Sequence, residues 1–442
     1  MDIQYRNDIP INYELVKEKI IDSGLQEVGK ASIREIVRLV NEIEKVSGDK
    51  FIRMEMGVPG LLPSDIGTEA EIAALRKGVA AKYPMIEGVA ELKVEISRFV
   101  KSFMNIDVDS AHCMSSAGSM QGGYATFMVA GRRDVKKDTV LFIDPGFPVQ
   151  KQQLNVMGMK YDTFDVYDYR GEKLRDKLEA YLKQGNISIM LYSNPNNPSW
   201  ICFTETELKI IAEMADKYDV IVVEDLAYFA MDFRKDLSKP GQEPYQPTVA
   251  NYTDNYLLLI SSSKAFSYAG QRVGMMVISD KLFKRQYPDL KRYFKSDEFG
   301  YAMVFGALYA LSSGCSHSAQ YALAAILKAA NDGEFNFVEG VRIYGERAKV
   351  MKKLFTDNGF KIVYDKDEDK PLADGFYFTF SYPGMTGVEL LEELIYYGIS
   401  AISLSITGSE HHEGMRACVS LTGEERFADL ESRLKKFKEH HS

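Results

Sequence analysis

Short runs of apolar, largely β-branched residues recur through the middle of the chain, and longer amphipathic stretches separate them. The stretch Glu205–Lys217 has apolar residues at helical spacing. Apolar runs without alternation are typical of strands buried on both faces, and helices between such strands predict a mostly parallel sheet. The predicted strands are 139–143, 187–192, 220–223, 256–260 and 273–278. We therefore expect an α/β core, with helices covering the sheet.

The pattern changes towards the carboxyl end, where helical stretches surround two strand-like runs. The predicted strands here are 375–380 and 415–420, and the predicted helices are 318–330, 337–357, 387–397 and 423–440. We expect residues 312–442, joined by residues 1–55, to form a smaller α+β domain. Residues 56–311 are then the large domain.

Charge and cysteine content narrow the classes of function. The 442 residues have a formal net charge of −9, which disfavours nucleic acid as a partner because phosphate binding needs clustered basic residues. The chain lacks an apolar run near the roughly 20 residues that cross a bilayer, so no membrane partner is expected. The four cysteines are scattered, which disfavours a metal site or a disulfide framework and favours the reducing cytoplasm.

Polar segments follow the predicted strands directly. In a parallel sheet, ligands bind at the carboxyl ends of the strands, so these segments are candidates for a common site. The segments are Asp144–Phe147, Ser193–Trp200, Glu224–Tyr228 and Ser261–Lys264, with Arg272 eight residues after the lysine. Earlier in the chain, Ser115–Gly122 is typical of a tight turn that opens a helix.

These residue types suit one cofactor when they act together. A lysine at a strand end can form a Schiff base, and a carboxylate can keep a ring nitrogen protonated so that the ring accepts electrons. A turn of small residues at a helix start offers N–H groups to a phosphate, and an arginine can complete that site. An aromatic side chain nearby can stack on the ring. The combination indicates pyridoxal 5'-phosphate.

Three motifs in this order resemble the class I/II aminotransferases, the aspartate aminotransferase-like group of fold-type I pyridoxal-phosphate enzymes. The motifs are Asn197-Pro198-Ser199, Asp225-Leu226-Ala227-Tyr228, and Ser261-Ser262-Ser263-Lys264 with Arg272. Taken singly, the asparagine could build a turn, the aspartate could cap a helix and the lysine could be a surface residue. The resemblance covers nearly the whole chain.

The resemblance implies a role for each motif residue. Lys264 is expected to hold the cofactor as a Schiff base, and Asp225 to contact the ring nitrogen. Asn197 and Tyr228 are expected on the phenolic oxygen. Ser261 and Arg272 are expected on the phosphate.

Further positions carry the resemblance over a longer stretch of chain. Gly118, Ser119 and Met120 match the family's phosphate loop, and Phe147 matches the aromatic residue that stacks on the ring. Tyr83 matches a tyrosine that reaches the phosphate bound by the other subunit, which implies a homodimer with shared active sites. Gly57, Asn197 and Arg416 are expected to bind the substrate, Arg416 through its α-carboxylate.

The implied function is transamination from an L-amino acid to a 2-oxo acid, with Lys264, Asp225 and Tyr228 as catalytic residues. A β-elimination enzyme would use the same residues, and a non-catalytic regulator that binds the cofactor is a further alternative. The amino donor stays open. Two departures from the family pattern are Trp200, where the motif usually ends in glycine, and residues 294–301, which match no family segment.

Overall fold

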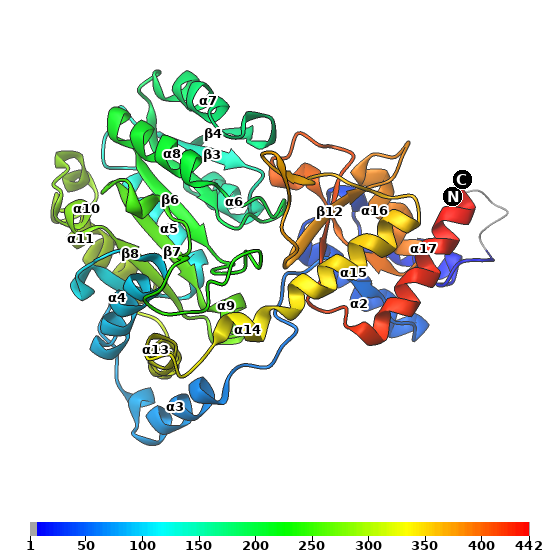
Figure 1. The fold of residues 1–442 in the computed structure, drawn as a ribbon, viewed down its shortest axis with the longest axis horizontal. Coiled ribbons are helices and arrows are strands. Elements are labelled where there is room, and N and C mark those ends of the chain that lie inside the picture. The colour runs from blue at the N-terminus through cyan, green and yellow to red at the C-terminus, as the bar shows by residue number, and fades with distance from the viewer. Residues whose placement is uncertain (1–6, 442) are drawn as a thin grey trace. The chain divides into compact units, whose positions relative to one another are not determined.

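A computed structural model describes residues 7–441, and by its internal contacts the chain divides into two compact units (Figure 1). The larger unit comprises Leu61–Asn196 and Cys202–Val341. The smaller unit comprises the chain up to Gly60, Asn197–Ile201 and the chain from Arg342. No helix among the described residues is long and apolar enough to cross a membrane.

A seven-stranded sheet forms the centre of the larger unit. In spatial order its strands are β2 (Cys113–Ser116), β8 (Gly274–Ile278), β7 (Tyr256–Ser261), β6 (Ile221–Leu226), β5 (Ile187–Ser193), β3 (Thr139–Asp144) and β4 (Lys160–Asp165). Strand β8 runs antiparallel to both of its neighbours, and the other pairs are parallel. The predicted, mostly parallel α/β sheet is therefore confirmed.

All five predicted strands of this sheet are present, and two strands escaped prediction for different reasons. Strand β4 lies at an edge of the sheet, and its sequence KYDTFD has no apolar run. Strand β2 has the sequence CMSS, in which two serines follow only two apolar residues. Apolar runs indicate strands only where both faces of the strand are covered by apolar side chains.

Helices pack along the sheet of the larger unit (Figure 1). Helix α5 (Gly118–Ala130) packs against β7 and β8, and α8 (Glu205–Tyr218) packs against β6. Helix α8 begins with a capping box, in which the Thr204 side chain accepts from the Glu207 N–H and the Glu207 carboxylate accepts from the Thr204 N–H. The longer helices are α3 (Asp65–Arg76), α4 (Ala90–Met104), α5 (Gly118–Ala130), α6 (Pro148–Met157), α7 (Lys173–Leu182), α8 (Glu205–Tyr218) and α13 (His317–Asn331). The shorter ones are α9 (Ser262–Ala265), α10 (Asp280–Lys284), α11 (Phe299–Tyr301), a π-helix (Ala302–Leu308), α12 (Tyr309–Ser312) and α14 (Phe337–Val341).

Helix α13 packs in the larger unit, against α3 and α4. Its buried residues include Leu323, Ile326 and Leu327, and the neighbouring Asp332 forms an ion pair with Arg98 of α4. The unit consequently extends to Val341, whereas the sequence analysis placed residues 312–341 with the smaller domain. The helical period shows that α13 has an apolar face but not which unit covers that face.

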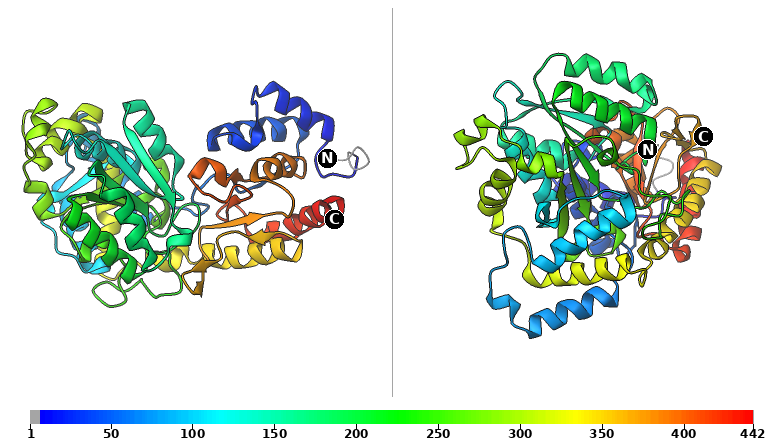
Figure 2. Two further views of the ribbon diagram at one scale, coloured as in Figure 1. Left: turned by 90° about the horizontal axis from the view of Figure 1, so that it is seen from above. Right: turned by 60° about the vertical axis from the view of Figure 1, so that its left-hand side comes forward.

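The smaller unit is built on a four-stranded antiparallel sheet. In spatial order its strands are β14 (Ile402–Ser403), β15 (Met415–Cys418), β12 (Tyr377–Ser381) and β9 (Lys361–Ile362). Helix α16 contacts β14 and β15 on one face, and α15 lies beside α17 on the other (Figure 2). The predicted helix over 337–357 is interrupted at Arg342, which separates α14 from α15. The elements of this unit are α1 (Tyr13–Asp22), α2 (Ile33–Ser47), β1 (Ile52–Arg53), α15 (Ile343–Asp357), β9 (Lys361–Ile362), β10 (Lys366–Asp367), β11 (Lys370–Pro371), β12 (Tyr377–Ser381), α16 (Gly387–Tyr396), β13 (Ile399–Ser400), β14 (Ile402–Ser403), β15 (Met415–Cys418) and α17 (Phe427–His441).

One buried ion pair joins α8 to the chain before α7. Arg170 approaches the Glu207 carboxylate with Nε at 2.6 Å and Nη2 at 2.9 Å, and Glu207 is fully buried. Burial alone would raise the pKa of Glu207, but the Arg170 hydrogen bonds and charge hold that pKa below its ordinary value. The carboxylate is therefore ionised in the interior and depends on its partner.

We predict that Arg170→Met destabilises the protein by about 3–5 kcal/mol, because it leaves the Glu207 charge buried without its counter-ion. The matched control is Arg175→Met, which removes a solvent-exposed pair with Glu213 and is expected to cost about 0–1 kcal/mol. Urea denaturation followed by circular dichroism measures both. Equal losses in the two variants would contradict the prediction.

Candidate active site

A buried carboxylate lies at the end of β6 in the larger unit. Asp225 is 6% exposed, and its Oδ2 accepts a 2.9 Å hydrogen bond from Nε2 of Gln150 on α6. Its buried Oδ1 accepts no hydrogen bond of normal geometry from any residue in 7–441. Burial raises the pKa of Asp225 to about 6, against the lowering effects of the Ala227 N–H, the Gln150 amide and the Lys264 charge. One carboxylate oxygen thus remains for a further hydrogen-bond donor.

Lys264 follows the next strand along the sheet. It lies in α9, one turn after β7, and β7 pairs directly with β6 so that Asp225 is opposite Leu259. The Lys264 charge is near enough to act on the pKa of Asp225. Ser261 caps α9, and its Oγ accepts the Ser263 N–H at 3.1 Å. The pairing of β6 with β7 therefore brings Lys264 and Asp225 to one edge of the sheet.

A tight turn opens α5 beside Arg272. Gly118 has φ of +71°, and a Cβ atom there would lie only 2.5 Å from Nη2 of Arg272. The positive φ favours glycine at this position, and the absence of a side chain lets the Arg272 guanidinium lie against the turn. Arg272 Nη1 is held by the Ala269 carbonyl at 2.8 Å. The buried Ser119 Oγ has no hydrogen-bond partner among the described residues, so a helix start, a guanidinium and a hydroxyl lie together here.

The other predicted residues of the larger unit occupy three different settings. Phe147 is partly buried at the N-cap of α6, one turn before Gln150. Tyr228 is 3% exposed and follows β6 closely in the chain. Met120 is 37% exposed. Tyr83 is 92% exposed, so it does not belong to the hydrophobic core of this chain.

The smaller unit holds Arg416, Asn197 and Gly57. Arg416 lies on β15 and is 1% exposed, with its Nη2 donating to the Glu55 carbonyl and its Nη1 to Oδ1 of Asn197 at 3.2 Å. Its buried Nε has no partner among residues 7–441. A Cβ atom at Gly57 would lie 1.9 Å from the Tyr377 hydroxyl, so the chain passes close to that ring. The structure therefore brings Asn197 into contact with the Arg416 guanidinium and places Gly57 against the Tyr377 ring, over which that guanidinium lies.

Sequence reasoning missed two residues of these sites, Gln150 and Tyr377. Gln150 follows Phe147 by three residues, so helical spacing places both on one face of α6, but an amide on a helix has no chemical signature of its own. Tyr377 lies in a predicted strand among other aromatic residues, and only the register of β12 with β15 distinguishes it.

Comparison with known proteins identifies the family of the chain. The model of the family described as "Aminotransferase class I and II" matches residues 50–425. The chain belongs to this family. It is therefore a pyridoxal-phosphate-dependent aminotransferase, which transfers an amino group between an amino acid and a 2-oxo acid.

This aminotransferase is similar to known proteins in sequence and in fold. It is 25% identical over 354 residues to a probable aspartate aminotransferase of Methanocaldococcus jannaschii, covering 76% of this chain and 88% of that protein. The solved alanine aminotransferase of Pyrococcus furiosus has a TM-score of 0.75 at 21% identity, covering 93% of this chain and 98% of that one. A mutant aspartate aminotransferase of Thermus thermophilus has a TM-score of 0.73 at 17% identity, with coverage of 92% and 97%. At these identities the two structures establish the fold.

The residues present in the aminotransferase fit pyridoxal phosphate. The cofactor needs an anion for its ring nitrogen, and Asp225 has one buried oxygen to offer. It also needs phosphate ligands, and Gly118, Ser119 and Arg272 lie together at a helix start. The Lys264 charge is close enough to Asp225 to lower the pKa of that carboxyl group.

Proposed function

We propose that Lys264 holds the cofactor covalently and that its Nζ moves the proton of the substrate Cα. The observation that carries this proposal is the buried Asp225 carboxylate, fixed by Gln150 on one oxygen, open on the other and influenced by the Lys264 charge. When bound, pyridoxal phosphate supplies a ring that accepts the electron pair left at Cα. An amine released beside that carbon can act as base and then as acid.

Asp225 is proposed to hold the cofactor's ring nitrogen in its protonated form. A carboxylate whose one oxygen is held by an amide can accept an N–H on its other oxygen, and a charge-assisted bond of this kind is strong in a buried site. Gln150 keeps the carboxylate plane fixed. Tyr228 and Asn197 are proposed to contact the phenolic oxygen, and Phe147 to stack on the ring.

The phosphate is proposed to bind at the start of α5. Backbone N–H groups at Gly118, Ser119 and Met120 point along the helix axis and favour an anion, and the Ser119 hydroxyl lacks another partner among the described residues. Arg272 contributes a full positive charge at the same turn. Ser261 adds a hydroxyl from the cap of α9.

Arg416 is proposed to bind the substrate's α-carboxylate, with Gly57 and Asn197 beside it. The guanidinium is buried, and its hydrogen bonds go to a carbonyl and an amide, so among the described residues its charge has no acidic partner. A planar guanidinium binds a carboxylate through two parallel hydrogen bonds. An L-amino acid and a 2-oxo acid share this carboxylate, so one residue serves both substrates.

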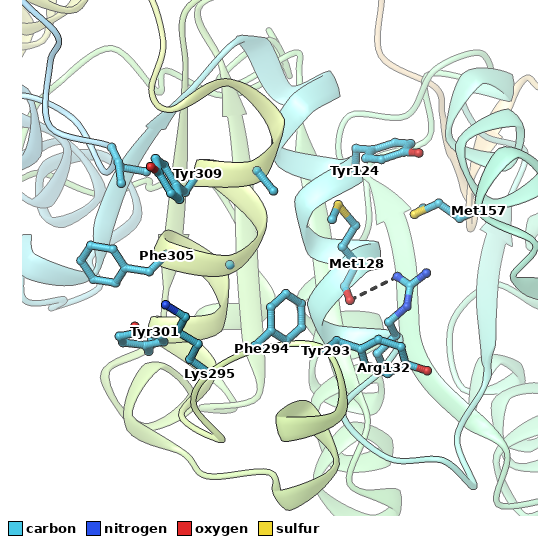
Figure 3. A pocket seen from close by; sticks show the side chains of 13 residues that line it. Tyr124, Met128, Arg132, Met157, Tyr293, Phe294, Lys295, Tyr301, Phe305 and Tyr309 are labelled. Carbon is cyan, nitrogen blue, oxygen red and sulfur yellow. Dashed lines mark hydrogen bonds between the residues drawn. The ribbon is translucent and has the colours of Figure 1, made fainter.

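We further propose that the protein is a homodimer through the face that includes Tyr83. A groove of about 940 Å³ lies on the larger unit and is lined by apolar and aromatic residues such as Phe294, Phe305 and Tyr309 (Figure 3). Phe305 and Tyr309 are 50% and 57% exposed. A Cβ at Gly314 would contact the Pro84 ring, so the Tyr83 turn lies beside the end of α12. A second copy would bury this apolar face.

The first test is the visible absorption spectrum of the purified protein during titration with a panel of amino acids. We expect one donor to bleach the bound cofactor's colour and a 2-oxo acid to restore it. Lys264→Ala should slow this half-reaction by about 10²–10⁴-fold or more, whereas Lys281→Ala, at an exposed lysine, should not. Release of ammonia and pyruvate from a cysteine conjugate would instead indicate β-elimination.

The second test concerns the pH dependence of cofactor binding. Because Asp225 has a pKa of about 6, it takes up a proton below that pH and loses its charge-assisted bond to the ring. Pyridoxal phosphate should therefore bind the wild-type apoprotein less tightly as the pH falls through 6. Asp225→Asn should bind about tenfold or more weakly at pH 8 and lack this component.

The readout is the ratio of the two dissociation constants, from absorbance titrations between pH 5 and 8. The phosphate titrates in both proteins, so its contribution cancels in that ratio. A ratio that stays constant across the range would contradict the role of Asp225.

The third test is the oligomeric state, measured by sedimentation equilibrium. The wild type should sediment as a dimer, and Phe305→Glu combined with Tyr309→Glu should shift it towards the monomer because two charges would enter the apolar contact. Ile21→Glu, at a residue 70% exposed on α1, is the matched control and should stay dimeric. A monomeric wild type would refute the proposal.

A further inference from the structure

Trp200 has a backbone conformation that tryptophan rarely adopts. Its φ is +66°, in the left-handed region that favours glycine, and its side chain is fully buried. A bulky side chain in this region strains the backbone. The family pattern has glycine at this position, so in this chain the indole must make contacts that offset the strain.

The indole lies directly on Gly375 and against Tyr377, all within the smaller unit. A Cβ atom at Gly375 would be 2.0 Å from Cε2 of Trp200, which leaves no room for any other residue. The rings of Trp200 and Tyr377 meet edge to face, with centroids 6.1 Å apart and an interplanar angle of 71°. Such a geometry is favourable between aromatic rings.

Tyr377 in turn supports Arg416. The Arg416 guanidinium carbon lies 4.4 Å from the centroid of the Tyr377 ring. In the register of β12 with β15, Arg416 is opposite Thr379, so Tyr377 is its diagonal neighbour on the same face. The close approach of Gly57 to the Tyr377 hydroxyl confines the other end of the ring.

We propose that Trp200 is a positioning residue for the substrate carboxylate: through Tyr377 it fixes the guanidinium plane of Arg416. This inference rests on the proposed function of Arg416. The Arg416 guanidinium is restrained by the Tyr377 ring on one of its faces and by the hydrogen bonds that it donates to Glu55 and Asn197. Removing the indole opens the space beside Gly375, so the Tyr377 ring can turn and Arg416 loses one restraint.

The test compares KM and kcat of variants, together with the dissociation constant of propionate from the holoenzyme, measured by calorimetry. Trp200→Gly should raise the KM of both the amino acid and the 2-oxo acid about tenfold and weaken propionate binding equally. The absorption of the bound cofactor should be unchanged. Trp200→Phe, which keeps an aromatic edge, should recover part of the loss.

Two further variants keep the inference testable if Trp200→Gly does not fold. Gly375→Ala places a methyl group inside the indole and should give the same KM increase from the opposite side of the contact. Tyr377→Leu should raise KM as well, and adding Trp200→Gly to it should have little further effect. Phe437→Leu, at a fully buried ring on α17, is the control that lowers stability without changing KM.

Unchanged KM and propionate binding in Trp200→Gly and Gly375→Ala would overturn the inference and leave Trp200 a core residue. Arg416→Lys distinguishes a failure of the Trp200 inference from a failure of the proposed role of Arg416. If Arg416→Lys raises KM and the Trp200 variants do not, the inference alone fails. If Arg416→Lys also leaves KM unchanged, the proposed role of Arg416 fails.

Discussion

The parallel pairing of β5, β6 and β7 is the constraint on which the site in the larger unit depends. It places the carboxyl ends of three strands side by side, so residues separated by some 30 positions in the chain become neighbours. The Asn194 N–H donates to the Asp225 carbonyl across β5 and β6, and Lys264 follows β7 by one turn. All residues of these three strands are buried, and groups placed on buried strands are held more precisely than groups on loops.

Burying charge at that edge has a thermodynamic cost. Burial raises the pKa of Glu224 to about 7 and that of Asp225 to about 6, although Thr248, Asn194 and Gln150 donate to these carboxyl groups. Since both values exceed those of the unfolded chain, the folded protein binds more protons, and its stability falls as the pH rises from about 4 to 7. A cationic ring nitrogen on Asp225 would reverse part of this loss.

How far the sequence predicts the structure differs from element to element. Strands such as β5 and β7 are predicted correctly because each is a mostly apolar run in the sequence. The motifs of Asp225 and Lys264 are recognised because their residue types indicate the chemistry directly. Gln150 and Tyr377 escape because their roles arise from helix and strand neighbours that no local pattern encodes. The position of α13 escapes for a related reason, since an apolar helical face does not specify its partner.

Trp200 is the only tryptophan in the chain, and its indole is buried within the smaller unit. Light at 295 nm would therefore excite a single chromophore there, while the colour of the bound cofactor would report on the larger unit through Lys264. The two units of this enzyme thus carry two different chromophores. Both signals can be followed in one cuvette, without labels and without altering a residue.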